Sequence, residues 1–174
     1  MKKGFTIVET LVAIAVLMIA IAGPLVVASK GLTAAVYARD QVIASNLAQE
    51  SMEKIRNIKD NNVANNRDWL TNLTDLNNNS CNGSSVCDAS SIDANIYSPC
   101  PSNPSIGCLL YYSSSDGYHH NLTSGSATQF YRYYYIKLLT GQNDEAVVTV
   151  VVRWNNGTVS NEVSLSSELS NKTR

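Results

Sequence analysis

The chain has 174 residues, which is room for one domain and an N-terminal anchor rather than for two domains. Its 13 basic and 14 acidic side chains nearly cancel, and no run of lysines or arginines is present, so charge does not support a nucleic-acid-binding surface. Asn, Ser and Thr dominate the polar positions, as is typical of an exported domain with a neutral, hydrogen-bonding surface.

An uncharged apolar segment from Leu11 to Ala28 follows the first ten residues. Together with Ile7 and Val8 it supplies the ~20 residues that a helix needs to cross the hydrocarbon of a bilayer. Lys2 and Lys3 precede the segment and no lysine or arginine lies inside it. This arrangement predicts a single-pass protein with its N-terminus in the cytoplasm and the rest of the chain outside.

Glu9 is the one charged residue at the start of this apolar segment. A carboxylate there costs roughly 2.5–3.5 kcal/mol at helix-centre depth and less near the interface, so it needs a cation. A secretory signal places its small-residue cleavage site after the apolar core, whereas here Gly4 lies before it. Cleavage between Gly4 and Phe5 would expose an amine on Phe5, one helical turn from Glu9. That amine would supply the cation, within one chain or from a neighbouring subunit.

The stretch Lys-Lys-Gly-Phe-Thr-Ile-Val-Glu-Thr-Leu-Val-Ala resembles the class III prepilin signal of type IV pilins and type II secretion pseudopilins. The resemblance covers about the first fifty residues. It implies cleavage after Gly4 by a membrane prepilin peptidase, N-methylation of Phe5, and a role for Glu9 in filament assembly. It also implies an α+β, type IV pilin-like fold, in which a long kinked N-terminal helix packs on a small antiparallel sheet.

The helix is expected to continue to about Lys59, because apolar residues recur at three- and four-residue steps beyond the apolar segment. The predicted organisation is a leader at residues 1–4, a membrane or filament-core half at 5–29, an amphipathic half at 30–60, and an exported head at 61–174. The amphipathic stripe is formed by Leu32, Val36, Ile43, Leu47, Ala48, Met52 and Ile55.

Gly23 and Pro24 interrupt the apolar half of this helix. Proline removes a backbone hydrogen bond and clashes with the preceding turn, so a kink or a locally melted turn is expected at this point.

Four cysteines lie between Cys81 and Cys108, in the part predicted to be exported, and therefore favour disulfides. Three pairings are possible. Closure between neighbours, Cys81 with Cys87 and Cys100 with Cys108, is preferred over the others. A zinc site would require Cys-x-x-Cys pairs, which are absent, and no metal or cofactor is expected. Residues 61–108 read as a Cys-containing loop region, with Trp69, Leu70, Leu73 and Leu76 spaced to cover one side of the head.

Residues 109–174 read as an antiparallel β-sheet. Asp116-Gly117 predicts a hairpin turn between residues 109–112 and 118–120, and residues 129–139 and 146–154 are rich in aromatic and β-branched side chains. Asn155-Asn156-Gly157 predicts a second turn before a strand at residues 158–165. One face of this sheet is expected to cover the amphipathic half of the helix.

No catalytic constellation is evident, so the chain is predicted not to be an enzyme. His119 and His120 are adjacent on a predicted strand and would point to opposite faces, as surface polar residues. The tyrosines between Tyr111 and Tyr135 either pack into the head and against neighbouring subunits, which is favoured, or form a platform for stacking on sugars or bases.

The function predicted from these features is that of a structural, minor subunit of a type IV pilus-like filament. Residues 45–56 and Val152-Arg153-Trp154 are similar to minor pilins and pseudopilins of the PilV and GspI kind. The partners implied are other pilin or pseudopilin subunits, the prepilin peptidase and an inner-membrane assembly platform. The chain would reside in the bacterial inner membrane and then in an extracellular or periplasmic filament. The alternatives are a type II secretion pseudopilin and, from another class, a filament-tip adhesin or DNA-binding module.

Overall fold

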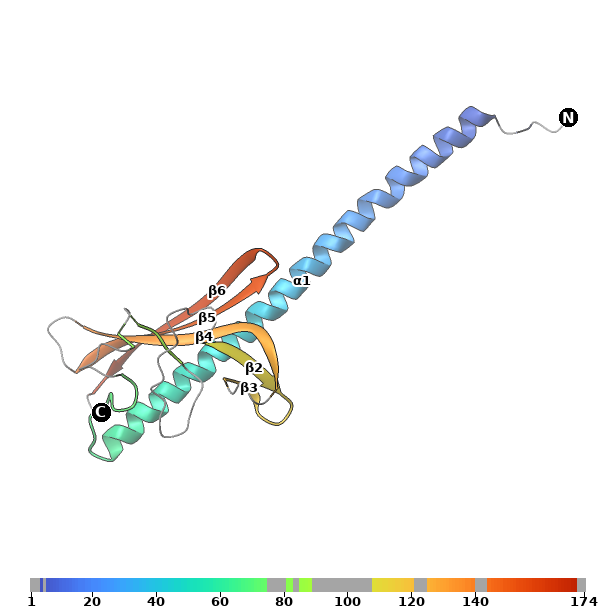
Figure 1. Ribbon diagram of the computed structural model, residues 1–174. Helices are drawn as coiled ribbons and strands as arrows, with labels where there is room; N and C mark the ends of the chain where they lie inside the picture. Colours follow the sequence, from blue (N-terminus) through green and yellow to red (C-terminus); the bar gives the residue numbers. More distant parts are fainter. Residues whose placement is uncertain are drawn as a thin grey trace. The chain divides into compact units, whose positions relative to one another are not determined.

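A computed structural model describes Gly4 and residues 6–74, 81–82, 85–88, 108–120, 125–139 and 144–171 (Figure 1). One helix is followed by strands, which makes the chain α+β as predicted. It divides into two compact units, Met1–Asp40 and Gln41–Arg174. The described elements are α1 (Ile7–Ala64), β1 (Cys87–Asp88), β2 (Leu109–Ser113), β3 (Gly117–His119), β4 (Ser126–Leu138), β5 (Glu145–Asn156) and β6 (Val159–Ser170).

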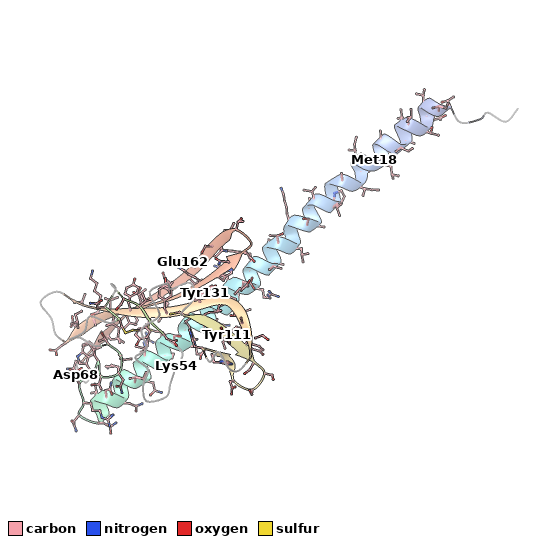
Figure 2. The ribbon with its side chains drawn as sticks, in the orientation of Figure 1. Met18, Lys54, Asp68, Tyr111, Tyr131 and Glu162 are labelled. Carbon is pink, nitrogen blue, oxygen red and sulfur yellow. A yellow bond between two sulfur atoms is a disulfide. The ribbon has the colours of Figure 1, made fainter. Side chains whose placement is uncertain are left out.

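The first unit contains the N-terminal part of α1, whose apolar side chains are exposed in the isolated chain. Ile7, Leu17 and Ile19 are 80%, 59% and 75% exposed, and Met18 projects outward in the same way (Figure 2). By length and composition this helix is apolar enough to cross a membrane. A helix that is apolar on every side is stable only where lipid or other protein surrounds it.

A kink or a locally melted turn was predicted at Gly23 and Pro24, and the structure has no melted turn there. The helix is uninterrupted from Ile7 to Ala64 with Pro24 inside it, and Figure 1 draws it running straight through this point. Proline eliminates a single backbone hydrogen bond, while the bonds of the turns on either side remain and keep the segment helical. The segment is therefore helical in the isolated chain, and the kink at Gly23 and Pro24 stays a prediction.

The second unit contains the C-terminal part of α1, which packs on the sheet along one stripe. Ala44, Leu47, Ala48, Met52 and Ile55 are at most 4% exposed and belong to the core of the head. These positions recur at three- and four-residue steps, as the amphipathic pattern predicted. The stripe was expected to start at Leu32, but Leu32 is 70% exposed in the first unit, so the buried stripe starts further along the helix.

The helix ends at Ala64, five residues beyond the predicted Lys59. Asn66 adopts a left-handed backbone conformation with φ 53°. The Arg67 N–H donates to the Asn62 carbonyl at 2.9 Å, and the Asn66 N–H donates to the Val63 carbonyl at 3.1 Å. This is a Schellman end, in which a residue that tolerates positive φ lets the chain turn back over the last carbonyls.

The sheet is antiparallel with strand order β3-β2-β4-β5-β6, and β1 also pairs with β4. Both predicted hairpins are present: β2 pairs with β3 across the Asp116–Gly117 turn, and β5 pairs with β6 across a turn that contains Gly157 at φ 63°. Asn156 and Val159 close the second turn. Glycine at the first central position of a two-residue loop matches the twist of the flanking strands.

The inner face of the sheet meets the helix and the segment that follows it. Trp69, Leu70 and Leu73 are buried, as their spacing predicted, and the Tyr134 hydroxyl donates to the Leu73 carbonyl at 2.8 Å. Leu76 lies outside the described residues. The core residues contributed by β4 and β5 alternate along each strand and are Phe130, Tyr134, Ile136, Ala146, Val148, Val150, Val152 and Trp154.

Disulfides are present, as the exported cysteines predicted. One joins Cys81 to Cys87, with the two Cα atoms 5.2 Å apart, and both residues are fully buried. Cys108 is also buried and disulfide-bonded, while Cys100, its predicted partner, lies outside the described residues. The Ile136 N–H donates to the Cys81 carbonyl at 2.6 Å, so the Cys81–Cys87 link is attached directly to β4.

Candidate functional site

The candidate processing and assembly site is the start of α1. The helix begins at Ile7, and Thr6 immediately before it acts as its N-cap. The Glu9 N–H donates to the Thr6 carbonyl at 3.1 Å and to its Oγ1 at 3.3 Å, while the Thr10 N–H donates to the same carbonyl at 3.2 Å. These bonds satisfy N–H groups that have no partner inside the helix. The cap lies after Gly4, so cleavage there would leave it in the mature chain.

Glu9 occupies the third helical position, which completes a Thr-x-x-Glu sequence typical of helix starts. An acid in the first turn is stabilised by the partial positive charge of the helix N-terminus. Glu9 is exposed and has the exposed apolar side chains of Val8 and Leu11 beside it. It is the only charged residue in the sequence between Gly4 and Ser29. The charge is therefore fixed at one position of an otherwise apolar helix.

Phe5, Lys2 and Lys3 lie outside the described residues, and Gly4 is described only as an exposed position with open space around its Cα. The pairing of a Phe5 amine with Glu9 thus stays a prediction, and so do cleavage and methylation. Gly23 and Pro24, which were singled out as a helix kink, lie on α1 well beyond this first turn.

An ionic contact that the sequence analysis missed joins the helix to the sheet in the head. The Arg132 guanidinium of β4 is fully buried, and its Nη1 donates to the Leu47 carbonyl at 3.3 Å and to Glu50 Oε2 at 3.1 Å. Lys54 also pairs with Glu50. Arg132 has the same strand phase as the buried Phe130 and Tyr134, so alternation along the strand was the signal that a cation would point into the core.

Burial and ion pairing shift the pKa values of Glu50 and Arg132 in opposite directions. Partial burial raises the pKa of the Glu50 carboxyl, but the hydrogen bond from Lys54 and the charge of Arg132 outweigh it, so that pKa lies below its ordinary value. Burial lowers the pKa of Arg132, and the nearby Glu50 carboxylate partly offsets the effect. Arg132 Nε and Nη2 have no hydrogen-bond acceptor among the described residues. The contact orients the helix on the sheet rather than forming a reactive centre.

The tyrosines are distributed through the head rather than gathered on one face. Tyr134 is fully buried and Tyr133 is 6% exposed, while Tyr112, at 49%, is the most exposed tyrosine among the described residues of the sheet. Tyr112 contacts Tyr118 edge-on at 5.1 Å between ring centroids, and Tyr118 contacts Phe130 at 5.9 Å. The aromatic residues thus link the β2–β3 hairpin to the core, which favours the packing interpretation over a stacking platform.

The histidines differ from their predicted role as surface polar residues. His120 Nε2 lies 3.0 Å from Asp88 Oδ1, and the two side chains are only 9% and 14% exposed. His119 is likewise half-buried. The prediction of surface positions is wrong because β1 pairs with β4 and places Asp88 within reach of His120. That partner comes from a segment distant in the sequence.

Comparison with known families identifies the start of the chain. Residues 1–23 match the prokaryotic N-terminal methylation motif, which is the class III prepilin signal of type IV pilins and pseudopilins. Comparisons with curated proteins and with solved structures gave no match. The motif supports a type IV pilin-like or pseudopilin subunit. It implies processing by a prepilin peptidase and assembly with other pilin subunits, and together with the apolar helix it fits a single-pass protein anchored in the inner membrane.

Proposed function

We propose that this chain is a minor structural subunit of a type IV pilus-like filament, cleaved between Gly4 and Phe5, methylated on Phe5 and polymerised from the inner membrane. One observation carries the proposal: the methylation motif at residues 1–23 leads into an exposed apolar helix whose only early charge is Glu9. Such a helix needs lipid before assembly and other helices after it.

The two parts of α1 support a division of roles. We assign residues 5–29 to the membrane and then to the filament core, residues 30–60 to the transition into the head, and residues 61–174 to the exported head. The charge pattern around the apolar segment favours a cytoplasmic N-terminus, since Lys2 and Lys3 precede it. The Cys81–Cys87 disulfide supports an oxidising compartment for the head.

The mechanism follows from the charge at the start of the helix. Leader removal would generate the Phe5 amine, and in a bundle of apolar helices the Glu9 carboxylate of one subunit would pair with the amine of its neighbour. In a low-dielectric core an unpaired carboxylate is costly, so this pairing would set the axial register of each incoming subunit. The Thr6 cap supports it, because it keeps the first turn helical after cleavage.

A pseudopilin of a type II secretion system carries the same signal and remains the second candidate on that basis. An adhesin or a DNA-binding module finds less support, because the described tyrosines of the head are mostly buried or half-buried. Deleting the genes for pilus assembly and those for secretion, one system at a time, would distinguish the pilus subunit from the pseudopilin. The subunit should leave the membrane fraction only when its own system is intact.

The test of the proposed processing is mass spectrometry of the protein recovered from its native membrane. We expect a chain that begins at Phe5 and carries one methyl group on its amine. A control sample from cells without prepilin peptidase should retain residues 1–4. Recovery of the unprocessed chain from cells with an active peptidase would overturn the proposal.

A further inference from the structure

The two free edges of the sheet differ sharply in length. β3 is an edge strand of three residues, whereas β6 is an edge strand of twelve and pairs in unbroken register with β5 from Glu145↔Ser170 to Asn156↔Val159. In the part of the chain that the structure describes, β6 pairs with β5 alone. Soluble proteins protect such edges with proline, charged side chains, bulges or short strands. β6 is long and has no proline, lysine or bulge, and its charged side chains are Glu162 and Glu168.

The backbone groups that face outward from β6 follow from its turn. Asn156 and Val159 close a two-residue β-turn, in which the N–H of the last residue points at the carbonyl of the first. Val159 therefore directs its hydrogen-bonding groups at β5, and every second residue does the same. Between the turn and the end of the strand, the residues whose N–H and C=O groups point away from β5 include Ser160, Glu162, Ser164, Ser166 and Glu168.

The side chains of β6 divide into two rows of different chemistry. On the helix-facing side, Val163 and Leu165 are only partly buried against the core, and Val159 is 59% exposed. On the opposite side, Glu162 and Glu168 stand exposed among serines, and β6 contains no lysine or arginine (Figure 2 labels Glu162). A strand added to this edge would extend the apolar row on one side and meet two acids on the other, of which Glu162 already accepts a hydrogen bond from Arg153 Nε of β5 at 2.8 Å.

We propose that the outer edge of β6 binds an extended segment of a different polypeptide, in which apolar residues alternate with basic ones. Backbone hydrogen bonds to the outward-facing groups would provide affinity, and the alternating side chains would provide specificity. Charge complementarity decides against a second copy of β6, because that strand would bring further acids and no base to the acidic row. The interaction is a property of the head and does not require leader cleavage or Glu9.

The test measures binding of a fluorescein-labelled ten-residue peptide of alternating valine and lysine to the full chain in a non-ionic detergent. A matched peptide of alternating valine and glutamate serves as the control. We expect saturable binding of the lysine peptide and at least about tenfold weaker binding of the glutamate peptide, because each acid on β6 repels a like charge placed opposite it. Equal affinity for the two peptides, or no binding of the lysine peptide, would overturn the proposal.

Two substitutions separate edge pairing from attraction of a cationic peptide to any acidic surface. Ser164→Pro removes an outward-facing N–H that the β5–β6 ladder does not use, and Ser164→Thr is its matched control, since it keeps that N–H. We expect Ser164→Pro to weaken binding at least about tenfold and Ser164→Thr to leave it unchanged, with circular dichroism reporting an intact sheet. Unchanged binding by a folded Ser164→Pro variant would contradict edge pairing.

If Ser164→Pro fails to fold, the relative affinity of Glu168→Lys for the two peptides provides an independent test. Glu168 is exposed on the acidic row, so its replacement leaves the core untouched and should shift preference from the lysine peptide toward the glutamate peptide. An unshifted preference would contradict the proposed chemistry of the partner. Analytical ultracentrifugation of the chain without peptide measures whether it dimerises. Dimers that form as the concentration rises and are absent in Ser164→Pro would show that a second copy occupies the edge, which would contradict the proposal.

Discussion

The two parts of helix α1 share one backbone geometry and differ in what their side chains require. From Ile7 to Ser29, in the first unit, the helix is apolar on every side and exposed, and Glu9 is its only charged residue. In the second unit, from Gln41, one stripe is buried against the sheet and the opposite side carries exposed charges such as Glu53 and Arg56. The first part depends on surroundings that other molecules must supply, while the second part is completed by its own chain.

Because of this difference, we expect substitutions in the processing signal and substitutions in the head to have independent effects. The signal and Glu9 act on a stretch of helix whose described side chains from Thr6 to Ala35 are exposed, so changes there should alter processing or assembly without unfolding the head. Changes in the second part should do the reverse. The predictions below test that separation, beginning with the largest effect.

Gly4→Leu should abolish leader removal. A bulky side chain replaces the small residue next to the expected cleavage site, in a position with open space and no role in packing. Mass spectrometry after coexpression with prepilin peptidase should find residues 1–4 retained, with the head still folded. Gly31→Ala, another glycine of the first unit with open space around it, is the control and should be processed normally. A processed Gly4→Leu chain would refute the cleavage site.

Glu9→Val should leave membrane insertion and cleavage intact but prevent incorporation into filaments, because the charge that pairs with a neighbour's amine is lost. The measurement is the amount of the subunit in sheared filaments relative to the membrane fraction. Glu53→Gln removes an exposed acid from the second part of the helix, where it pairs only with Arg56 on the surface, and should assemble normally. Normal filaments containing Glu9→Val would contradict the role of this residue.

Met52→Ala and Met18→Ala make the same chemical change in the two parts of the helix. Met52 is 2% exposed in the core, so its truncation should lower the free energy of unfolding of the head by about 2–5 kcal/mol. Met18 is 66% exposed, and its truncation should leave head stability unchanged. Chemical denaturation of the full chain in detergent, followed by tryptophan fluorescence, provides the comparison. Equal effects would show that the two parts do not differ as described.

The smallest expected effect is a dependence of head stability on pH through Glu50. Its pKa is lowered in the folded chain from an ordinary value of 4.5, so its pairing with Lys54 and Arg132 stabilises the fold above that value. The stabilisation is lost as pH falls below 4.5 and through the lower pKa of the folded chain. Because Glu50 is partly exposed, the change should be modest. Glu50→Gln should flatten this part of the pH profile of unfolding, and an unchanged profile would exclude the contribution.

Local patterns predicted much of this molecule. Hydrophobic periodicity identified the amphipathic stripe that includes Leu47 and Met52, and a high content of aromatic and β-branched side chains identified β4 and β5. Asp116-Gly117 and Gly157 located both hairpins, although Gly117 itself is the first residue of β3 and pairs with Ser113. These features can be predicted because each depends on residues close together in the chain. The structure has no melted turn at Pro24, since the single lost hydrogen bond competes with many that remain, and a kink there stays a prediction.

The sequence by itself determined the processing motif, the position of Glu9, the apolar helix and where the strands β2 to β6 lie along the chain. Only the tertiary structure decided which distant groups meet: Arg132 with Glu50, His120 with Asp88, and the Tyr134 hydroxyl with the Leu73 carbonyl. Periodicity shows which face of an element is buried, but not what lies opposite. The partners are set by strand order and register, which bring together groups up to 111 residues apart in the chain, as in the hydrogen bond from Arg56 to Ser167.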